Sequence, residues 1–187
     1  MKSLIASIRL VIATMLICVA GYTALILGLA RLVTPDTAEG SLIKSAGGKI
    51  IGSHLIAQKF TQPRYFWPRP SAAGKDGYDA SSASGSNKSP TSSDLTERAK
   101  TIIPQYGATA EKPLPPELAA ASGGGLDPHI TEHAALYQAE RVAKARGLSQ
   151  AQVEELVRQQ AFAPGGIFMP DRLVNVLELN LALDQAR

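Results

Sequence analysis

The chain has one cysteine in 187 residues, Cys18, and that residue lies within a long apolar segment. The rest of the chain has no cysteine, so neither a disulfide framework nor a cysteine-ligated metal can hold it together. A domain of this length can be stabilised by its own hydrophobic core. Oxidising compartments permit disulfides without requiring them, so this absence does not decide the compartment.

The sequence also lacks the short signatures of common catalytic sites. It has no G-x-x-x-x-G-K-[ST] phosphate loop, no H-E-x-x-H metal motif and no G-x-S-x-G nucleophile elbow. His129 and His133 have the i, i+4 spacing that one helix face can offer to a metal, but a third ligand would have to be His54 or a carboxylate. The simpler interpretation is that His129 forms hydrogen bonds near a helix start and that His133 is solvated.

The chain has no formal net charge beyond the apolar segment and its flanking basic residues. Three of the 19 basic residues, Lys2, Arg9 and Arg31, flank that segment, which leaves 16 basic against 16 acidic residues from Leu32 onward. A nucleic-acid-binding domain needs a basic face that displaces counterions from phosphates. We therefore expect no nucleic-acid partner.

The sequence does contain an uncharged run of 21 residues, from Leu10 to Ala30. At about 1.5 Å per residue, a helix of this length spans roughly 31 Å, the thickness of a bilayer's hydrocarbon core. We predict a transmembrane helix over residues 10–32, preceded by a short cytoplasmic N-terminus at residues 1–9. A cleaved signal peptide is the alternative, with Gly28 and Ala30 before the cut, but its apolar region is usually about 7–15 residues long.

The basic residues around this run predict its orientation. Lys2 and Arg9 precede the run, whereas Arg31 follows it alone. Basic residues favour the cytoplasmic side of a membrane. The N-terminus is therefore predicted to be cytoplasmic and the large domain extracytoplasmic.

Beyond the anchor, we predict a juxtamembrane linker at residues 33–48 and a domain over residues 49–187, which opens with a strand at Ile50. Residues 62–73 combine three aromatic residues with three prolines. Such a segment can neither form a helix nor pair in the middle of a sheet. Residues 74–93 are rich in Gly, Ser, Ala and Asn, a composition typical of a flexible loop.

Helix signals mark the second half of the domain. Residues 94–105 are predicted to form one helix, and a single further turn is possible at residues 116–121. Thr131 is suited to cap a helix that runs to Arg146, with Gly147 beyond its end.

Ser149 and Gln152 then fit the capping box of a further helix. Within residues 173–183, the leucines from 177 to 183 alternate as in a strand, whereas Leu173, Leu177 and Leu181 also fit a helix. We favour a strand first, which turns helical towards Asp184. The predicted fold class is an α+β exported domain with much irregular structure, tethered by a single N-terminal transmembrane helix.

Three arginines, Arg69, Arg141 and Arg146, are expected to form structural ion pairs. The acidic candidates for these pairs are Asp127, Glu132 and Glu140. The aromatic run from Tyr65 to Trp67 is expected to be buried, either within the domain or against a partner.

Several motifs occur together in one order. They are GSHLI at residues 52–56, FWPRPSA at 66–72, GSN at 85–87 with PT at 90–91, ASG at 121–123, GLDPHI at 125–130, Gln138, RVA at 141–143, ARG at 145–147, VNVL at 174–177 and LNLALD at 179–184. On these motifs the chain resembles the KdpC family, the C subunits of the Kdp potassium-transporting ATPase, over nearly its whole length. Residues 83–92 depart from the family's usual SGGSNLGPTN, and APGGIFMPD at residues 163–171 also diverges.

The resemblance implies an assembly in the bacterial inner membrane. Its partners would be a KdpA-like, channel-like potassium-binding subunit, a KdpB-like P-type ATPase subunit and a small KdpF-like peptide. ATP hydrolysis on the ATPase subunit would drive potassium uptake, so ATP and K+ would be handled by the partners and this chain would not be an enzyme. Such proteins are also described as catalytic chaperones that raise the ATPase subunit's affinity for ATP, a role that an extracytoplasmic domain cannot perform by direct contact.

No catalytic residue, metal ligand or cofactor site is assigned to this chain. Ten residues within the motifs are candidates for structural or partner contacts: Arg69, Ser71, Ser86, Asn87, Ser122, Asp127, His129, Arg141, Asn175 and Asn180. The leading hypothesis is an accessory subunit that stabilises the potassium-uptake complex. The alternative is a membrane-tethered extracytoplasmic binding module, with a pocket near residues 122–129.

Overall fold

The computed structural model describes residues 2–168 and 171–186. The chain divides into two compact units, the first ending at Ser53 and the second beginning at His54.

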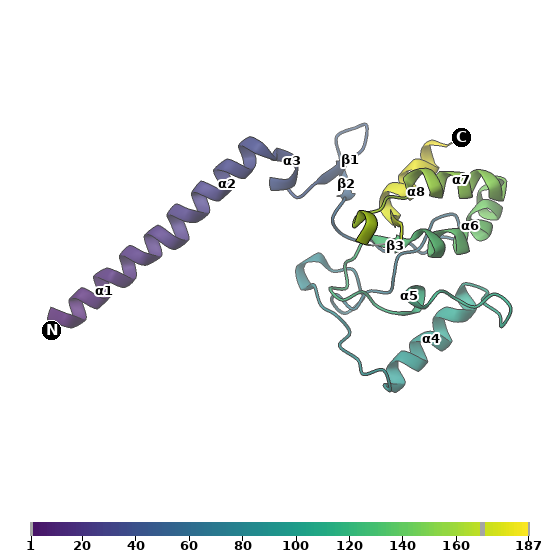
Figure 1. Ribbon diagram of the computed structural model, residues 1–187, viewed down its shortest axis with the longest axis horizontal. Coiled ribbons are helices and arrows are strands. Elements are labelled where there is room, and N and C mark those ends of the chain that lie inside the picture. Colours follow the sequence, from purple (N-terminus) through teal and green to yellow (C-terminus); the bar gives the residue numbers. More distant parts are fainter. Residues whose placement is uncertain (1, 169–170, 187) are drawn as a thin grey trace. The chain divides into compact units, whose positions relative to one another are not determined.

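One continuous helix, Lys2–Val33, makes up most of the first unit (Figure 1). It consists of α1 (Lys2–Met15), a π-helical segment (Leu16–Gly21) and α2 (Tyr22–Val33). The predicted transmembrane segment lies inside this helix, which also includes residues 2–9. None of its side chains is buried in protein, so its apolar surface needs another nonpolar phase. The helix is long and apolar enough to cross a membrane.

Regular structure follows the helix where the sequence predicts a linker. A single turn, α3 (Pro35–Ala38), begins with proline at a helix start, where its missing N–H costs nothing. Strands β1 (Leu42–Lys44) and β2 (Ile50–Ser53) then pair antiparallel, with Leu42 opposite Ser53. The Ser53 hydroxyl donates to the Gly40 carbonyl at 2.7 Å and closes the base of the hairpin. The strand expected at Ile50 is confirmed.

Three helices form the frame of the second unit. They are α6 (Glu132–Arg146), α7 (Gln150–Gln160) and α8 (Val176–Gln185), and α7 packs against both of the others (Figure 1). Thr131 caps α6, and Gly147 ends it with a φ of 69°, a left-handed conformation that favours glycine. Ser149 and Gln152 form the capping box expected at the start of α7.

A short antiparallel ribbon lies beside this frame. Strand β3 (His129–Thr131) pairs with β4 (Leu173–Asn175), placing Ile130 opposite Val174. Both of these side chains are fully buried. Helices and strands thus share one core, and the α+β class is confirmed.

The leucine alternation over residues 173–183 was expected to extend the strand, and that expectation is wrong beyond Asn175. The Asn175 side chain accepts hydrogen bonds from the N–H groups of Leu177 and Glu178, which caps α8 and ends the strand. The buried positions in α8 include Val176, Leu179, Asn180 and Leu183, a helical spacing.

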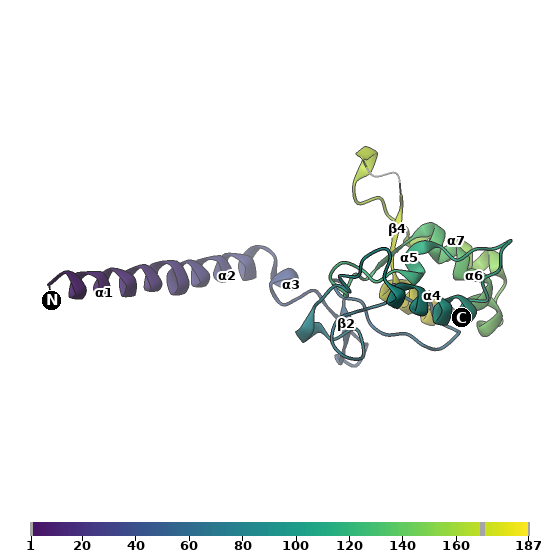
Figure 2. The same ribbon diagram turned by 90° about the horizontal axis from the view of Figure 1, so that it is seen from below.

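Irregular chain covers one side of this frame. It carries a 3₁₀ turn (Ala80–Ser82), α4 (Ser93–Gln105) and α5 (Pro116–Ala119) (Figures 1 and 2). Of these elements, α4 and α5 are in contact with each other. The helix expected at residues 94–105 is confirmed. The segment predicted to be a flexible loop is tied down, because the Tyr78 hydroxyl donates to the Arg69 carbonyl at 2.8 Å.

The core of the second unit joins all these parts. It contains small residues of α6, such as Ala135 and Ala139, that let neighbouring chain approach closely. The largest fully buried apolar side chains are Phe66, Leu118, Ile130, Leu179 and Leu183. Phe66 comes from the aromatic and proline-rich segment, so its expected burial is confirmed.

Replacing Leu179 by Ala should remove a fully buried side chain and leave a cavity in this core. We expect the free energy of unfolding to fall by about 2–5 kcal/mol, the usual range for such a truncation. Urea unfolding of the full chain in detergent would measure it. The matched control is Ile103→Ala in α4, where the side chain is 40% exposed. Equal losses in the two variants would contradict this assignment of the core.

Candidate functional site

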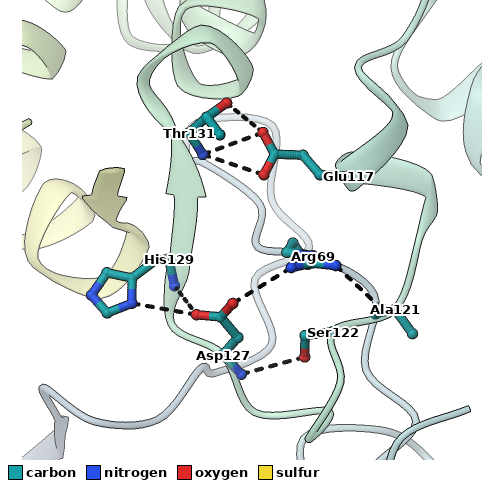
Figure 3. A network of polar contacts seen from close by, with 7 residues as sticks. All are labelled: Arg69, Glu117, Ala121, Ser122, Asp127, His129 and Thr131. Carbon is teal, nitrogen blue, oxygen red and sulfur yellow. Dashed lines mark hydrogen bonds and ion pairs between the residues drawn. The ribbon is translucent and has the colours of Figure 1, made fainter. Parts of the chain in front are cut away.

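Asp127 is the centre of a polar network next to β3 (Figure 3). One carboxylate oxygen accepts the backbone N–H of His129 at 3.0 Å and lies 3.3 Å from the His129 ring nitrogen Nδ1. The other lies 3.5 Å from the Arg69 guanidinium, which also donates to the Ala121 carbonyl at 3.3 Å. The network therefore ties the loop before β3 to the proline-rich segment.

Glu117 makes a second polar link, from α5 to the start of α6 (Figure 3). Its carboxylate accepts the Thr131 hydroxyl, and both of its oxygens lie 3.3 Å from the Thr131 backbone nitrogen. The same hydroxyl oxygen accepts the Ala134 N–H at 3.1 Å, so Glu117 orients the residue that caps α6.

The geometry of these groups does not form a nucleophile–base pair. The Ser122 hydroxyl oxygen accepts the backbone N–H of Asp127 at 3.4 Å, whereas the His129 ring faces the Asp127 carboxylate. Among the seven residues of Figure 3, no contact joins hydroxyl and imidazole. His133 is exposed, and no group of three or more potential metal ligands occurs in residues 2–168 and 171–186. The network can position backbone but has no arrangement for acyl transfer.

The pKa of the Asp127 carboxyl is lowered, mainly by its hydrogen bond with the His129 side chain. The His129 backbone N–H and the charge of Arg69 act in the same direction, while burial opposes them. The folded state therefore favours the ionised carboxylate.

Two buried amides hold the aromatic and proline-rich segment in place. The Gln138 side chain accepts the Trp67 N–H at 2.9 Å and donates to the Trp67 carbonyl at 3.1 Å. The Asn180 side chain does the same for Phe66, at 2.8 and 3.0 Å. We call these four bonds the amide clasp. They give two adjacent residues the backbone partners that a sheet would otherwise supply.

Arg141 reinforces the amide clasp from α6. Its guanidinium donates to the carbonyls of Pro63 and Tyr65 at 2.6 and 3.0 Å, and to the Gln138 side chain at 2.7 Å. It also lies 3.7 Å from the centre of the Trp67 ring system. Burial lowers the pKa of Arg141 to about 10, so the group remains charged at neutral pH.

Glycines allow two loops to meet beside the network. A Cβ added to Gly85 would lie 2.3 Å from the Gly123 carbonyl oxygen. One added to Gly125 would lie 2.4 Å from the Ser84 carbonyl oxygen, and Gly125 has a φ of +74°. The Ser71 hydroxyl donates to the Gly125 carbonyl from the proline-rich side. The glycines of the GSN and GLDPHI motifs are thus needed for close packing.

An aromatic groove of about 500 Å³ lies between the proline-rich segment and α4. It is lined by Lys59, Phe60, Thr61, Trp67, Pro68, Pro70, Tyr78, Ile102, Gln105, Tyr106 and Leu118. The Trp67 and Tyr106 rings meet edge to face with centroids 5.1 Å apart. Burial raises the pKa of Tyr78 to about 12 and also raises that of Tyr106, so both remain neutral. The groove offers flat apolar walls with one cation at Lys59.

Two of the three arginines form ion pairs, and one of these pairs involves a predicted acid. Arg69 pairs with Asp127 as expected. Arg141 binds carbonyls and an amide instead of a carboxylate, so its predicted role is wrong. Arg146 pairs with Asp184 at 2.7 Å, an acid outside the predicted set. Glu132 and Glu140 pair instead with Arg172 and Lys112.

The structure brings together only some of the ten candidate residues. Arg69, Ser122, Asp127 and His129 form the network; Arg141 and Asn180 hold the aromatic segment; and Ser71 meets the loop at Gly125. Asn175 caps α8 and donates to the His54 carbonyl at 2.9 Å. Ser86 and Asn87 take no part in the network of Figure 3.

Gln138 is one of the residues that carry the family resemblance, but it was not among the candidate contact residues expected from the sequence. The available signal was a polar residue on the alanine face of α6, four residues from both Ala134 and Val142. A fully buried amide at such a position has to find partners.

A family model described as K+-transporting ATPase, c chain, matches residues 4–185. The chain belongs to the KdpC family. A potassium-transporting ATPase KdpC subunit of Parvibaculum lavamentivorans is 64% identical over 185 residues, covering 99% of this chain and 97% of the relative. KdpC subunits of Trichlorobacter lovleyi and Koribacter versatilis are each 43% identical, and each alignment covers 98% of this chain and at least 94% of the relative.

The loop contact of this KdpC chain can be tested with Gly85→Ala. The added methyl group overlaps the Gly123 carbonyl, so we expect the free energy of unfolding to fall by about 1–3 kcal/mol, the usual cost of overpacking. Urea unfolding of the full chain in detergent would measure it. Gly124→Ala is the matched control, because nothing lies within 4 Å of its added Cβ. A neutral Gly85→Ala would show that the loops do not meet.

The lowered pKa of Asp127 predicts part of the chain's acid sensitivity. Its stabilising contribution is complete above the unfolded-state pKa of about 3.9 and is lost as the pH falls through the lower folded-state value. Asp127→Asn should therefore be less stable at neutral pH and lose less stability between pH 5 and 2 than the wild type. Thermal unfolding across this pH range measures the difference, with the exposed Asp76→Asn as the control. Parallel wild-type and Asp127→Asn curves would refute the role.

Proposed function

We propose that this chain is a non-catalytic accessory subunit of an ATP-driven potassium-uptake complex. The observation that carries the proposal is membership of the KdpC family over residues 4–185, since that family is described as one chain of a K+-transporting ATPase. The site supports it, because its polar groups are engaged in holding backbone. The subunit's role is to stabilise the assembly of a channel-like potassium-binding subunit and a P-type ATPase subunit, with a small KdpF-like peptide.

The proposed location is the bacterial inner membrane, with residues 10–32 spanning the bilayer and the second unit outside the cytoplasm. The exposed apolar helix supports the anchor, and the excess of basic residues before it supports the orientation. In this orientation ATP is bound and hydrolysed by the partner ATPase subunit. A chaperone effect of the second unit on ATP affinity would then have to be transmitted through contacts within the membrane. Such coupling requires a structural element with two states, whose equilibrium is shifted both by the second unit and by ATP binding on the other side.

A membrane-tethered binding module is the second candidate, and the aromatic groove favours it. A cavity of about 500 Å³ with mostly apolar walls and few polar groups is the usual form of a small-molecule site. It lies next to the amide clasp, and none of residues 122–129, where a pocket was predicted, lines it.

Affinity purification in mild detergent from membranes of potassium-starved cells distinguishes the two candidates. An accessory subunit should copurify with large multi-span proteins and with potassium-stimulated ATPase activity. The control is a chain that ends at Ser53, which keeps the helix and the hairpin but lacks the second unit. A full chain that elutes alone and without ATPase activity would refute the subunit role and favour the binding module.

A further inference from the structure

The segment between α7 and β4 has a firmly held base. Phe162 and Leu173 form an isolated antiparallel bridge, with their N–H groups donating to each other's carbonyls at 2.9 and 2.8 Å. The Arg172 guanidinium donates to the carbonyls of Ala161 and Arg158 at 2.6 and 3.1 Å, and lies 3.3 Å from the Glu132 carboxylate. The two ends of the segment are therefore fixed to α7 and α6.

Residues 161–168, which we call the apolar finger, extend from this base. The sequence AFAPGGIF offers no side-chain charge and no side-chain hydrogen-bonding group. A 3₁₀ turn (Gly166–Phe168) lies near its end, and Figure 2 shows this turn standing away from α6 and α7. Phe168 is 92% exposed and Phe162 is 42% exposed.

The exposure of Phe168 is unusual for the second unit. Of its other large apolar side chains that the structure describes, the most exposed is Leu55, at 56%. Comparable exposure occurs in the N-terminal helix, for example 83% at Leu32. In that helix the exposed apolar surface belongs to a segment suited to lipid, and the apolar finger has the same chemistry.

The covalent connection limits how far the start of the second unit can lie from the end of this helix. Eight residues, 34–41, separate Val33 from Leu42, and Leu42 is paired directly with Ser53. At about 3.5 Å per residue plus one strand spacing of about 5 Å, Ser53 lies within roughly 35 Å of the helix end. That limit is about the width of a domain of this size. This tether is therefore short enough to permit features of the second unit to reach a bilayer surface at the helix end.

We propose that the apolar finger inserts into the interfacial region of the membrane in which the chain is anchored. Phenylalanine is favourable at the boundary between headgroups and acyl chains, and the finger has no charge to desolvate there. The fixed base gives the insertion a defined direction, and tethering raises the effective concentration of the surface. We favour a membrane over a protein partner because the chain's N-terminal helix is itself long and apolar enough to cross a membrane. This inference rests on the proposed membrane anchor and does not depend on the proposed role in a potassium-uptake complex.

Site-specific fluorescence in lipid nanodiscs tests the insertion. The full chain would carry Cys18→Ala and Phe168→Cys, labelled with bimane, in nanodiscs with or without nitroxide-bearing lipids. We expect emission shifted to shorter wavelengths and strong quenching by a nitroxide near the headgroups. The matched control is Lys144→Cys, at an exposed position on α6, which should show water-like emission and little quenching. Equal melting temperatures of the labelled chains would show that both are folded.

Water-like emission at position 168 with no more quenching than at position 144 would overturn the proposal. A shift to shorter wavelengths without lipid quenching, seen only when partner subunits copurify, would also overturn it. That second result would assign the apolar finger to a protein contact.

Discussion

The second unit depends on the amide clasp, in which Gln138 and Asn180 each bind both backbone groups of one residue. A segment interrupted by prolines cannot obtain such partners from a sheet, yet Phe66 must enter the core to fill it. Leaving one of these buried backbone groups without a partner would cost about 1–3 kcal/mol. Because the two amides lie on α6 and α8, the clasp also fixes the spacing of those helices around the segment.

The other polar contacts are of the same kind, because in them side chains form hydrogen bonds with backbone groups. Arg141 and Arg146 donate to carbonyls of residues 63–65, and Arg69 reaches the carbonyl of Ala121. Asp127 and Asn175 accept backbone N–H groups at the starts of β3 and α8. In a domain with so much irregular chain, few buried backbone groups can form hydrogen bonds within helices or sheets. Side chains therefore have to supply the hydrogen-bond partners of these backbone groups. The motif residues Arg69, Asp127 and Asn175 therefore each have a structural role in this KdpC chain.

Local signals predicted much of the fold, and non-local contacts account for the rest. The helix caps at Thr131 and Ser149 and the strand at Ile50 depend on neighbouring residues, and each was predictable. The start of α8 was missed because the leucine alternation outweighed Asn175, a capping residue with an acid three positions later. The partners of Gln138 and Asn180 are 71 and 114 residues away in sequence, so no periodicity could reveal them. The same holds for the contact between Gly85 and Gly123.

Most polar side chains of the motifs bind groups within the domain, so we expect recognition by the second unit to use its apolar surfaces. Two of these are the aromatic groove beside the amide clasp and the apolar finger beyond α7. They differ in what they can recognise: the groove has shaped walls and a cation at Lys59, whereas the finger presents an uncharged tip without hydrogen-bonding side chains. Shape and charge can discriminate between ligands, but an uncharged tip can only distinguish an apolar phase from water. Specific contacts are therefore expected at the groove, and attachment to a surface at the finger.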